Sequence, residues 1–390
     1  MPLTVLYVET GTGYGGSGRS LLQLLSGLDR SRFRPVVVIY RDDGGATDAV
    51  RAMGVPVHAL SGATMESSNY AQVLGRWLRH ELPKAARLIR LIRRERVELI
   101  HLNNDVYSNV AGLAAGRLLG IPIVCHLRLT RRPTRLERWL GRWATVKVVL
   151  TQEAVAFYRA YWPHDEIVCI PNSVTIPLLP VPDGATLRQA LKVPSDHRVV
   201  ALIARCIPRK GYEEFLQAAK LVRDQLSRVS FVIFGNGPGS DEAYERRMRS
   251  LASGIGLNGE LIWGGWQEDP AAVYGLPDIV VQASTTFPEG LSRVVLEAMA
   301  YGKPVVATKI VGNREAVVDL QTGLLIEPAD PHALADAILT LLRDPGLAQR
   351  YGAEARQRAI EYFSSDLHAK RMSELYARLL NSSSPQSGRG

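Results

Sequence analysis

Two glutamates with seven residues between them are the side chains whose spacing most suggests chemistry. Glu289 stands in a Pro-Glu-Gly loop, and Glu297 stands in the helical pattern that follows it. Free N–H groups at the start of a helix attract an anion, and the second carboxylate would lie about 10 Å further along at a rise of about 1.5 Å per residue. The spacing therefore suits a ligand with a phosphate at one end and hydroxyls at both, such as a nucleotide-sugar. The alternative is a solvated helix face that carries two glutamates, with an apolar side made of Leu291, Val294, Val295 and Met299.

A short basic segment, ARCIPRKG, spans Ala204 to Gly211 directly after an apolar strand pattern. Arg205 offers a planar fork to phosphate and Lys210 offers a point charge. Together the two cations could neutralise a departing nucleotide diphosphate. The chain has no metal-binding Asp-x-Asp motif, so neither a metal nor another cofactor is expected. The alternative is that Arg209 and Lys210 are solvated surface charges.

A glycine-rich loop, GTGYGGSG, occupies residues 11–18 between a strand pattern and a helix that begins near Ser20. Glycines let a backbone approach an anion closely and donate N–H groups to it. A dinucleotide fingerprint fits only loosely here, and taken alone it is a weak signal. The loop is a candidate ligand contact, and a strand–helix turn that binds nothing is the alternative.

Short apolar strands alternate with helical patterns along the whole chain. Continuous Val/Ile/Leu runs are typical of parallel strands buried on both faces, and strand–helix alternation indicates doubly wound sheets. Ligands of such sheets bind beyond the carboxyl ends of the strands. The predicted strands are Thr4–Glu9, Pro35–Tyr40, Val57–Leu60, Leu99–Asn103, Ile123–Arg128, Val146–Thr151, Ile167–Ile170, Val199–Ala204, Ser230–Phe234, Leu261–Trp263, Ile279–Gln282, Pro304–Thr308 and Gly323–Ile326.

The length of 390 residues suits two domains, and a proline-interrupted stretch at residues 172–185 marks the hinge between them. We predict a first domain over residues 1–178 and a second over 179–365. A helix over 366–380 is expected to pack back on the first domain, before a disordered tail at 381–390. Three well-separated cysteines argue for a reducing compartment. The N-terminus does not resemble a signal peptide, and no apolar run is long enough to span a membrane. A cytoplasmic protein is therefore expected.

The segment FPEGLSRVVLEAMAYGKPVVAT resembles the donor-site signature of the retaining glycosyltransferases of family 4. The basic segment at 204–211 is similar to that family's Gly-Arg-Leu…Lys-Gly motif, and Pro171-Asn172-Ser173 to its Pro-Asn-Gly segment. The sequence departs from the family at Ala204 and Ser173, where glycine is usual. The resemblance implies the GT-B fold, in which two Rossmann-like doubly wound domains face each other across a deep cleft. It also implies sugar transfer with retention and without a metal.

The resemblance assigns roles to individual residues. It implies that Glu289 contacts donor-sugar hydroxyls, that Glu297 binds the ribose, and that the N–H groups near Gly290 and Leu291 bind the distal phosphate and the sugar. His126, at a strand end, is expected to hydrogen-bond the transferred sugar or stabilise positive charge. The remaining expected donor contacts are Gly15, Gly16, Asn236 and Gly237, beside the catalytic cations Arg205 and Lys210. The expected acceptor-side residues are Asn103, Asn104 and Arg128.

The net charge of +9 comes from the first half of the chain. Residues 1–178 hold 23 Lys/Arg and 14 Asp/Glu, whereas residues 179–390 hold 24 of each. Two segments, 84–94 and 128–143, combine arginines with apolar or tryptophan residues, which suits an anionic membrane surface. We therefore expect a glycan or lipid-linked acceptor, taken by a protein peripheral to the inner face of the membrane. No recognition module for nucleic acid accompanies the charge, so no nucleic-acid partner is expected.

Two other functions fit parts of the pattern. A GT-B nucleotide-sugar epimerase would bind the same donor and act without an acceptor. A non-catalytic membrane- or polyanion-binding module could use a transferase scaffold, although the joint presence of Arg205, Lys210, Glu289 and Glu297 argues against it.

Overall fold

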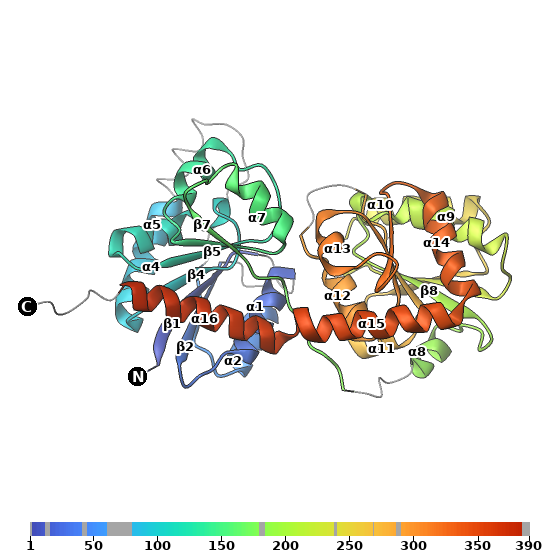
Figure 1. The fold of residues 1–390 in the computed structure, drawn as a ribbon, viewed down its shortest axis with the longest axis horizontal. Coiled ribbons are helices and arrows are strands. Elements are labelled where there is room, and N and C mark those ends of the chain that lie inside the picture. The colour runs from blue at the N-terminus through green and yellow to red at the C-terminus, as the bar shows by residue number, and fades with distance from the viewer. Residues whose placement is uncertain are drawn as a thin grey trace, which may run out of the picture. The chain divides into compact units, whose positions relative to one another are not determined.

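The computed structural model describes residues 2–11, 16–40, 45–60, 80–178, 184–237, 240–267, 269–285 and 290–383 of the chain. The chain forms two compact units, drawn in Figure 1. The first unit comprises Met1–Ser173 and Ser365–Gly390, and the second comprises Val174–Ser364. The chain thus leaves the first unit after Ser173 rather than after the expected residue 178, and it returns at Ser365.

The first unit is built on a parallel sheet in the order β3-β2-β1-β4-β5-β6-β7. Nearly every residue of the inner strands is buried, as expected for strands covered by helices on both faces. Their continuous apolar runs made these strands readable from the sequence. The strands are β1 Leu3–Glu9, β2 Phe33–Ile39, β3 Val57–Ala59, β4 Leu99–Leu102, β5 Ile123–Leu127, β6 Val146–Val149 and β7 Glu166–Cys169.

Helices cover both faces of this first sheet. One face packs against α1 (Gly16–Gly27), α2 (Gly45–Ala52) and the terminal helix α16 (Ser365–Ser383). Met372 and Tyr376 of α16 are completely buried in that core, and α16 lies beside α1 in Figure 1. The other face packs against α4 (Leu82–Glu95), α5 (Val110–Leu119), α6 (Arg135–Gly141) and α7 (Gln152–Arg159).

The terminal helix is longer than the sequence pattern indicated. It continues to Ser383, so the prediction of a disordered tail from residue 381 was wrong for the first three residues. Residues 384–390 lie outside the described part of the chain.

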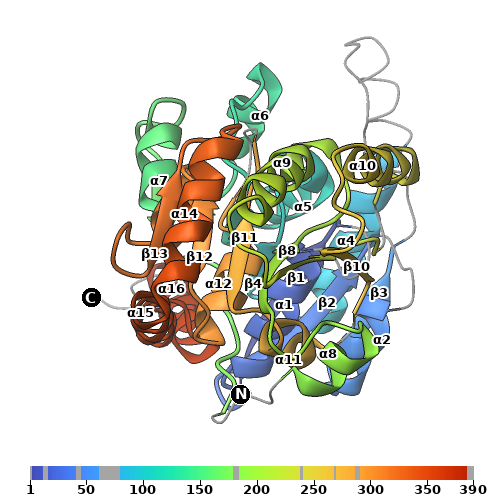
Figure 2. The ribbon, with the colours of Figure 1, turned by 90° about the vertical axis from the view of Figure 1, so that its right-hand side faces the viewer.

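The second unit is built on a parallel sheet in the order β10-β9-β8-β11-β12-β13. Helices α9 (Tyr212–Arg223), α10 (Glu242–Gly254) and α14 (Pro331–Arg343) share one core with it. Figure 2 shows α9 and α14 side by side over this sheet. The strands are β8 Arg198–Ile203, β9 Val229–Phe234, β10 Leu261–Gly265, β11 Ile279–Gln282, β12 Val305–Thr308 and β13 Gly323–Ile326.

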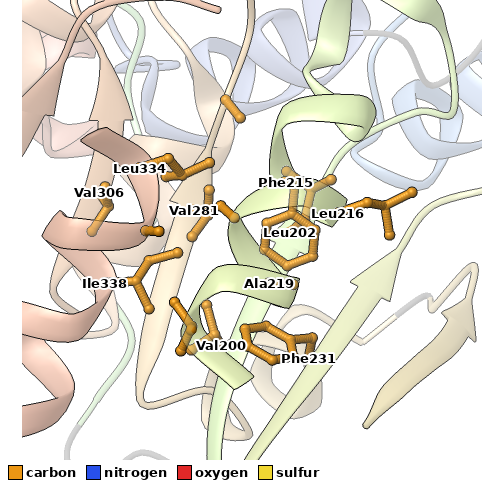
Figure 3. Close-up of a cluster of buried hydrophobic side chains, with 14 of the residues drawn as sticks. Val200, Leu202, Phe215, Leu216, Ala219, Phe231, Val281, Val306, Leu334 and Ile338 are labelled. Carbon is orange, nitrogen blue, oxygen red and sulfur yellow. The ribbon is translucent and has the colours of Figure 1, made fainter. Parts of the chain in front are cut away.

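Figure 3 shows how this core is filled. Side chains of α9 and α14 meet those of the four central strands; the labelled members are Val200, Leu202, Phe215, Leu216, Ala219, Phe231, Val281, Val306, Leu334 and Ile338. The remaining helices are α8 Ala185–Ala190, α11 Pro270–Gly275, α12 Arg293–Ala300, α13 Val311–Ala316 and α15 Pro345–Phe363.

Both sheets have a point at which the strand order reverses, between β1 and β4 in the first and between β8 and β11 in the second. Such a point is where open α/β sheets bind ligands, beyond the carboxyl ends of the strands. The two doubly wound parallel sheets expected of a GT-B protein are therefore confirmed, and the residues that follow β1, β4, β8 and β11 are the first to consider as a site.

The two ends of the second unit lie next to each other. The backbone N–H of Val174 donates to the carbonyl oxygen of Phe363 over 2.8 Å, and Val174 pairs with Ser364 in a parallel bridge. Residues 174–364 are thus a single insertion between the main part of the first unit and its last helix.

Candidate active site

The loops after β8 and β11 touch at the reversal point of the second sheet. A short 3-10 turn, Pro208–Lys210, ends at Gly211, whose φ is +73°. A Cβ on Gly211 would meet the carbonyl oxygen of Ala283 at 1.9 Å, so only glycine permits this contact. The N–H of Thr285 also donates to the carbonyl oxygen of Arg209 over 3.2 Å. The basic segment is therefore fixed against the start of the loop that leads to Gly290.

Burial and like charges act together on Lys210. The side chain is half-buried, and burial, together with the neighbouring Arg209 and Arg205, lowers the pKa of Lys210 to about 7. Burial and Arg209 also lower the pKa of Arg205. Placing an anion at this loop would relieve the repulsion and favour the protonated lysine. The segment predicted to bind diphosphate has the electrostatics of an anion site.

The helix that carries Glu297 begins later than the sequence pattern suggested. Helix α12 starts at Arg293, and its N-cap residue, Ser292, makes no side-chain hydrogen bond to the first turn. Gly290 and Leu291 therefore precede the helix, and placing Leu291 on its apolar face was wrong. That face consists of Val295, Leu296, Ala298, Met299 and Ala300. Glu289 lies outside the described residues.

Two neighbours hold the carboxylate of Glu297. The Tyr274 hydroxyl donates to Oε2 over 2.7 Å, and Arg293, one turn earlier in α12, donates to Oε1 over 3.1 Å. The Tyr274 ring stacks on Tyr301, with ring centroids 5.3 Å apart. Glu297 is thus a preoriented hydrogen-bond acceptor in the second turn of α12. No pattern in the sequence points to Tyr274, which lies 23 residues away.

The loops after β9 and β10 meet at the edge of the same sheet. Asn236 has a φ of +67°, and its side-chain amide donates to Glu245 over 2.6 Å. Gly237 is buried under the ring of Trp266, which is itself 45% exposed. The structure thus places a partly exposed aromatic side chain beside the predicted donor residue Gly237, whereas the amide of Asn236 is directed to Glu245.

A buried polar cluster supports the loop after β11, and the sequence analysis missed it. Asn313 donates to the side chain of Gln282 over 2.6 Å and to the carbonyl oxygen of Thr308 over 2.9 Å. Gln282 in turn donates to Ser284, whose carbonyl oxygen accepts from the Thr308 hydroxyl, each over 2.7 Å. All four side chains are buried, which fixes the backbone at Ser284.

In the first unit, the predicted acceptor-side residues gather around Glu9, the last residue of β1. Asn103 and Asn104, which follow β4, both donate to the Glu9 carboxylate. Arg128, which follows β5, donates to the carbonyl oxygen and to Oδ1 of Asn103, and also to Asn172 over 2.9 Å. Sequence reasoning did not identify Glu9; the only signal was a carboxylate at the end of a buried strand before a glycine-rich loop.

His126 belongs to a buried cluster on the face covered by α16. Its ring is 1% exposed and stacks on His101, with centroids 5.7 Å apart, while His101 Nδ1 lies 2.5 Å from the Tyr376 hydroxyl. Among the described residues neither ring nitrogen of His126 has a hydrogen-bond partner. Burial, with Arg128 and the other histidines nearby, holds the pKa of His126 well below its usual range. The ring is therefore neutral near pH 7.

Gly16 is the first residue of α1, and its carbonyl oxygen accepts from the Ser20 hydroxyl over 2.9 Å. Gly15 lies outside the described residues. The start of α1 is also tied to β1, because the Ser17 hydroxyl donates to Glu9 over 3.1 Å. Gly16 therefore lies beside the cluster around Glu9.

The two basic segments differ in how much charge they expose. Lys84 was expected to contribute to a basic surface, but it is buried in an ion pair with Glu81 at 2.8 Å. The arginines of α4 that follow it are exposed, namely Arg87, Arg90, Arg93 and Arg94. In the second segment Arg131 is paired with Glu137, and the exposed arginines and tryptophan are Arg132, Arg135, Arg138, Trp139 and Arg142. In the described part of the chain, no helix has both the length and the apolar character needed to cross a bilayer.

Sequence comparison identifies two family models that together match most of the chain. The model described as "Glycosyl transferases group 1" matches residues 183–358, and "Glycosyl transferase 4-like domain" matches residues 15–173. The chain is 33% identical over 242 residues to the D-inositol 3-phosphate glycosyltransferase of Corynebacterium efficiens, covering 60% of this chain and 56% of that protein. It is 29% identical over 228 residues to the GDP-mannose-dependent alpha-(1-6)-phosphatidylinositol monomannoside mannosyltransferase of Mycolicibacterium smegmatis, covering 56% and 58%. The chain thus spans little more than half the length of these curated relatives.

Solved structures share the fold over nearly the whole chain. Anabaena HepE in complex with UDP and glucose superposes with a TM-score of 0.82 at 22% identity, covering 96% of this chain and all of that one. A glycosyltransferase from Rickettsia africae superposes with a TM-score of 0.83 at 20% identity, covering 97% and 99%. At these identities the likeness concerns the fold.

Proposed function

We propose that this chain, which belongs to the glycosyl transferases group 1 family, moves a sugar from a nucleotide-diphosphate sugar to a hydroxyl acceptor. The transfer proceeds with retention and without a metal. One observation carries the proposal most directly. Three elements meet at the reversal point of one parallel sheet: the Arg205–Lys210 loop, the residues before α12, and the oriented Glu297 carboxylate. Cations, open helix N–H groups and a fixed acceptor for hydroxyls are what a nucleotide-sugar requires.

In this proposal the cations act on the leaving group. Arg205 and Lys210 bind the diphosphate and stabilise the negative charge that develops on it as the glycosidic bond breaks. Glu297 accepts hydrogen bonds from the ribose, and Glu289 contacts hydroxyls of the donor sugar. The acceptor hydroxyl attacks from the face that the nucleotide leaves, and a phosphate oxygen takes its proton. The role proposed for His126 is a hydrogen bond to the transferred sugar, because a neutral imidazole can both donate and accept one.

The printed names of similar proteins suggest which donors to try. The HepE structure contains UDP, and the mycobacterial mannosyltransferase is described as GDP-mannose-dependent. Both nucleotides therefore belong in a donor screen.

For the acceptor we propose a glycan, an inositol phosphate or a lipid-linked polyol, met at the inner face of the membrane. The named relatives act on D-inositol 3-phosphate and on a phosphatidylinositol mannoside. The exposed surface of residues 128–143 supports a membrane location, because it presents arginines around Trp139, which is 55% exposed. Arginines attract anionic lipid, and an exposed indole favours the interfacial region of a bilayer.

The test is a donor screen. The protein is incubated with UDP- and GDP-sugars, and nucleotide release and sugar product are followed. Lys210→Ala, Glu289→Ala and Glu297→Ala are run beside Lys220→Ala, a control on the exposed face of α9, where Lys220 pairs with Asp224. Donor-specific release that is lost in the three site variants and kept in the control is expected. An epimerised donor without net nucleotide release would overturn the proposal, as would the absence of any nucleotide-sugar binding.

A further inference from the structure

We propose that Glu9 is a positioning residue for the acceptor, and that it acts by directing the amide oxygen of Asn104 toward an acceptor hydroxyl. This inference rests on the transferase function proposed above. It adds a residue to the acceptor side and assigns one atom, Asn104 Oδ1, as the contact with the substrate.

Glu9 holds three separate parts of the first unit together. Its Oε1 accepts from the N–H of Gly11 over 2.6 Å, from the Ser17 hydroxyl over 3.1 Å and from Asn104 Nδ2 over 2.6 Å. Its Oε2 accepts from Asn103 Nδ2. The residue is 2% exposed, so a single buried carboxylate ties the glycine-rich loop and the start of α1 to the end of β4.

The chemistry of the partners fixes the orientation of both asparagine amides. A carboxylate only accepts hydrogen bonds, so each asparagine must turn its Nδ2 toward Glu9. Arg128 only donates, so Asn103 must turn its Oδ1 toward the guanidinium, which agrees with the same orientation. The chain Arg128–Asn103–Glu9 therefore permits one arrangement of donors and acceptors.

This arrangement separates the roles of the two asparagines. Asn103 is completely buried, and both ends of its amide are used, so it supports the site without touching a ligand. Asn104 is half-buried, and its Nδ2 donates to Glu9 and to the Thr10 hydroxyl. Within the described residues no hydrogen bond reaches its Oδ1. That oxygen lies beyond the carboxyl end of β4, at the reversal point of the sheet, where it can accept from a substrate hydroxyl.

The side chain at position 9 must be an acceptor at both oxygens. Glutamine has the same shape, but its NH₂ group would face either the Asn103 amide or the donors that converge on Oε1. A donor facing a donor leaves buried groups unsatisfied, and this weakens the set of hydrogen bonds that orients the Asn104 amide. Glu9→Gln is thus a test of orientation at nearly constant volume.

The experiment compares Glu9→Gln, Glu9→Asp and Asn104→Ala with wild type. The control is Asp165→Asn, which removes the partner of the buried Lys147 at the other end of the sheet and tests for a general loss of stability. Sugar transfer to the hydroxyl probes myo-inositol and glycerol is measured against hydrolysis of the same UDP- or GDP-sugar. Donor affinity is measured separately by titration. The exchange rate of the Gly11 amide reports on the loop directly.

We expect Glu9→Gln and Asn104→Ala to lower the ratio of transfer to hydrolysis about tenfold or more, with donor affinity within twofold of wild type. Glu9→Asp keeps the charge, so its ratio of transfer to hydrolysis should lie between that of wild type and that of Glu9→Gln. Glu9→Gln should also speed exchange at Gly11, whereas Asp165→Asn should lower only the melting temperature.

An unchanged ratio of transfer to hydrolysis in Glu9→Gln overturns the inference. So does a ratio that falls by the same factor in Asp165→Asn. A wild type that hydrolyses the donor without transferring sugar to either probe also overturns it. Failure of the proposed function has a different result, since wild type would then release nucleotide from no donor.

Discussion

The indole of Trp266 rests on the backbone of Gly237, so that a Cβ at position 237 would approach the ring to 2.1 Å. The two residues follow the neighbouring strands β9 and β10 at the edge of the second sheet, beside β8, the strand that the basic segment follows. Gly237 contacts a large aromatic side chain that is 45% exposed. Such a ring suits a planar base, because base–aromatic stacking is tolerant of base identity.

Gly237→Ala should therefore weaken donor binding by displacing the ring of Trp266. Stacking is worth about 1–3 kcal/mol per base, so we expect a loss of roughly tenfold in affinity for the nucleotide-sugar. Titration with the donor, followed by tryptophan fluorescence, measures it. Gly259→Ala is the matched control, because a Cβ there meets no atom within 4 Å. Equal affinity in the two variants would mean that Trp266 does not contact the donor.

Donor affinity should depend on pH through Lys210. The pKa of about 7 in the free protein means that the side chain loses its proton as the pH rises through neutrality, while a bound diphosphate favours the protonated form. Affinity should thus be highest below pH 7 and fall by up to about tenfold per unit above it. A nucleotide-sugar is the right probe, since its diphosphate does not titrate in this range. Lys210→Arg should remove the slope and keep binding, and an unchanged slope in Lys210→Gln would assign it to another group.

Leu320→Gly should stabilise the second unit. Leu320 has a φ of +60° and is 70% exposed, so it adopts a left-handed conformation without gaining burial. That conformation costs a residue other than glycine roughly 1–2 kcal/mol, part of which the greater freedom of glycine in the unfolded chain offsets. We expect the free energy of unfolding, measured in urea, to rise by about 0.5–1 kcal/mol. Leu320→Ala keeps the Cβ and should gain nothing; an equal gain there would refute strain as the cause.

Binding to anionic vesicles should require the exposed arginines of residues 128–143. Each cation near an anionic surface contributes about 1 kcal/mol, so replacing Arg135, Arg138 and Arg142 with serine should weaken binding roughly 100-fold. Flotation with phosphatidylglycerol vesicles at low salt measures this, and added salt should weaken the wild type as well. Trp139→Ala should also weaken binding, and Trp266→Ala, which alters an exposed tryptophan of the second unit, should not. Wild type that stays unbound at low salt would remove the membrane from the proposal.

The strands were predictable because burial on both faces leaves little choice of residue. Runs such as the one from Val36 to Ile39 are apolar at every position, and their alternation with helical patterns is enough to indicate two parallel sheets. The basic segment after β8 could also be found, because arginine and lysine directly after a strand mark the ligand edge of such a sheet.

The supports of the site could not be predicted, because they join residues that are distant in sequence. Glu9 and Asn103 lie 94 residues apart, and Gln282 and Asn313 lie 31 apart. A single sequence carries no sign of such pairs. The prediction that Lys84 contributes to a basic surface was wrong for a different reason. Its partner Glu81 stands only three residues before it, at helical spacing, and the ion pair between them is buried.

The adjacency of Val174 and Ser364 makes the second unit an exchangeable module. A segment whose two ends meet can be cut out and replaced at a single point, without altering the strand order on either side. A chimera that takes residues 174–364 from a relative would carry over the whole cationic loop, Glu297 and Trp266 together, while Glu9, Asn104 and the closing helix α16 stay with the host. If the donor and the acceptor are bound by separate units, new pairings of sugar and acceptor can arise by exchange of one segment, with crossovers on either side of residues 174–364, instead of by many point substitutions.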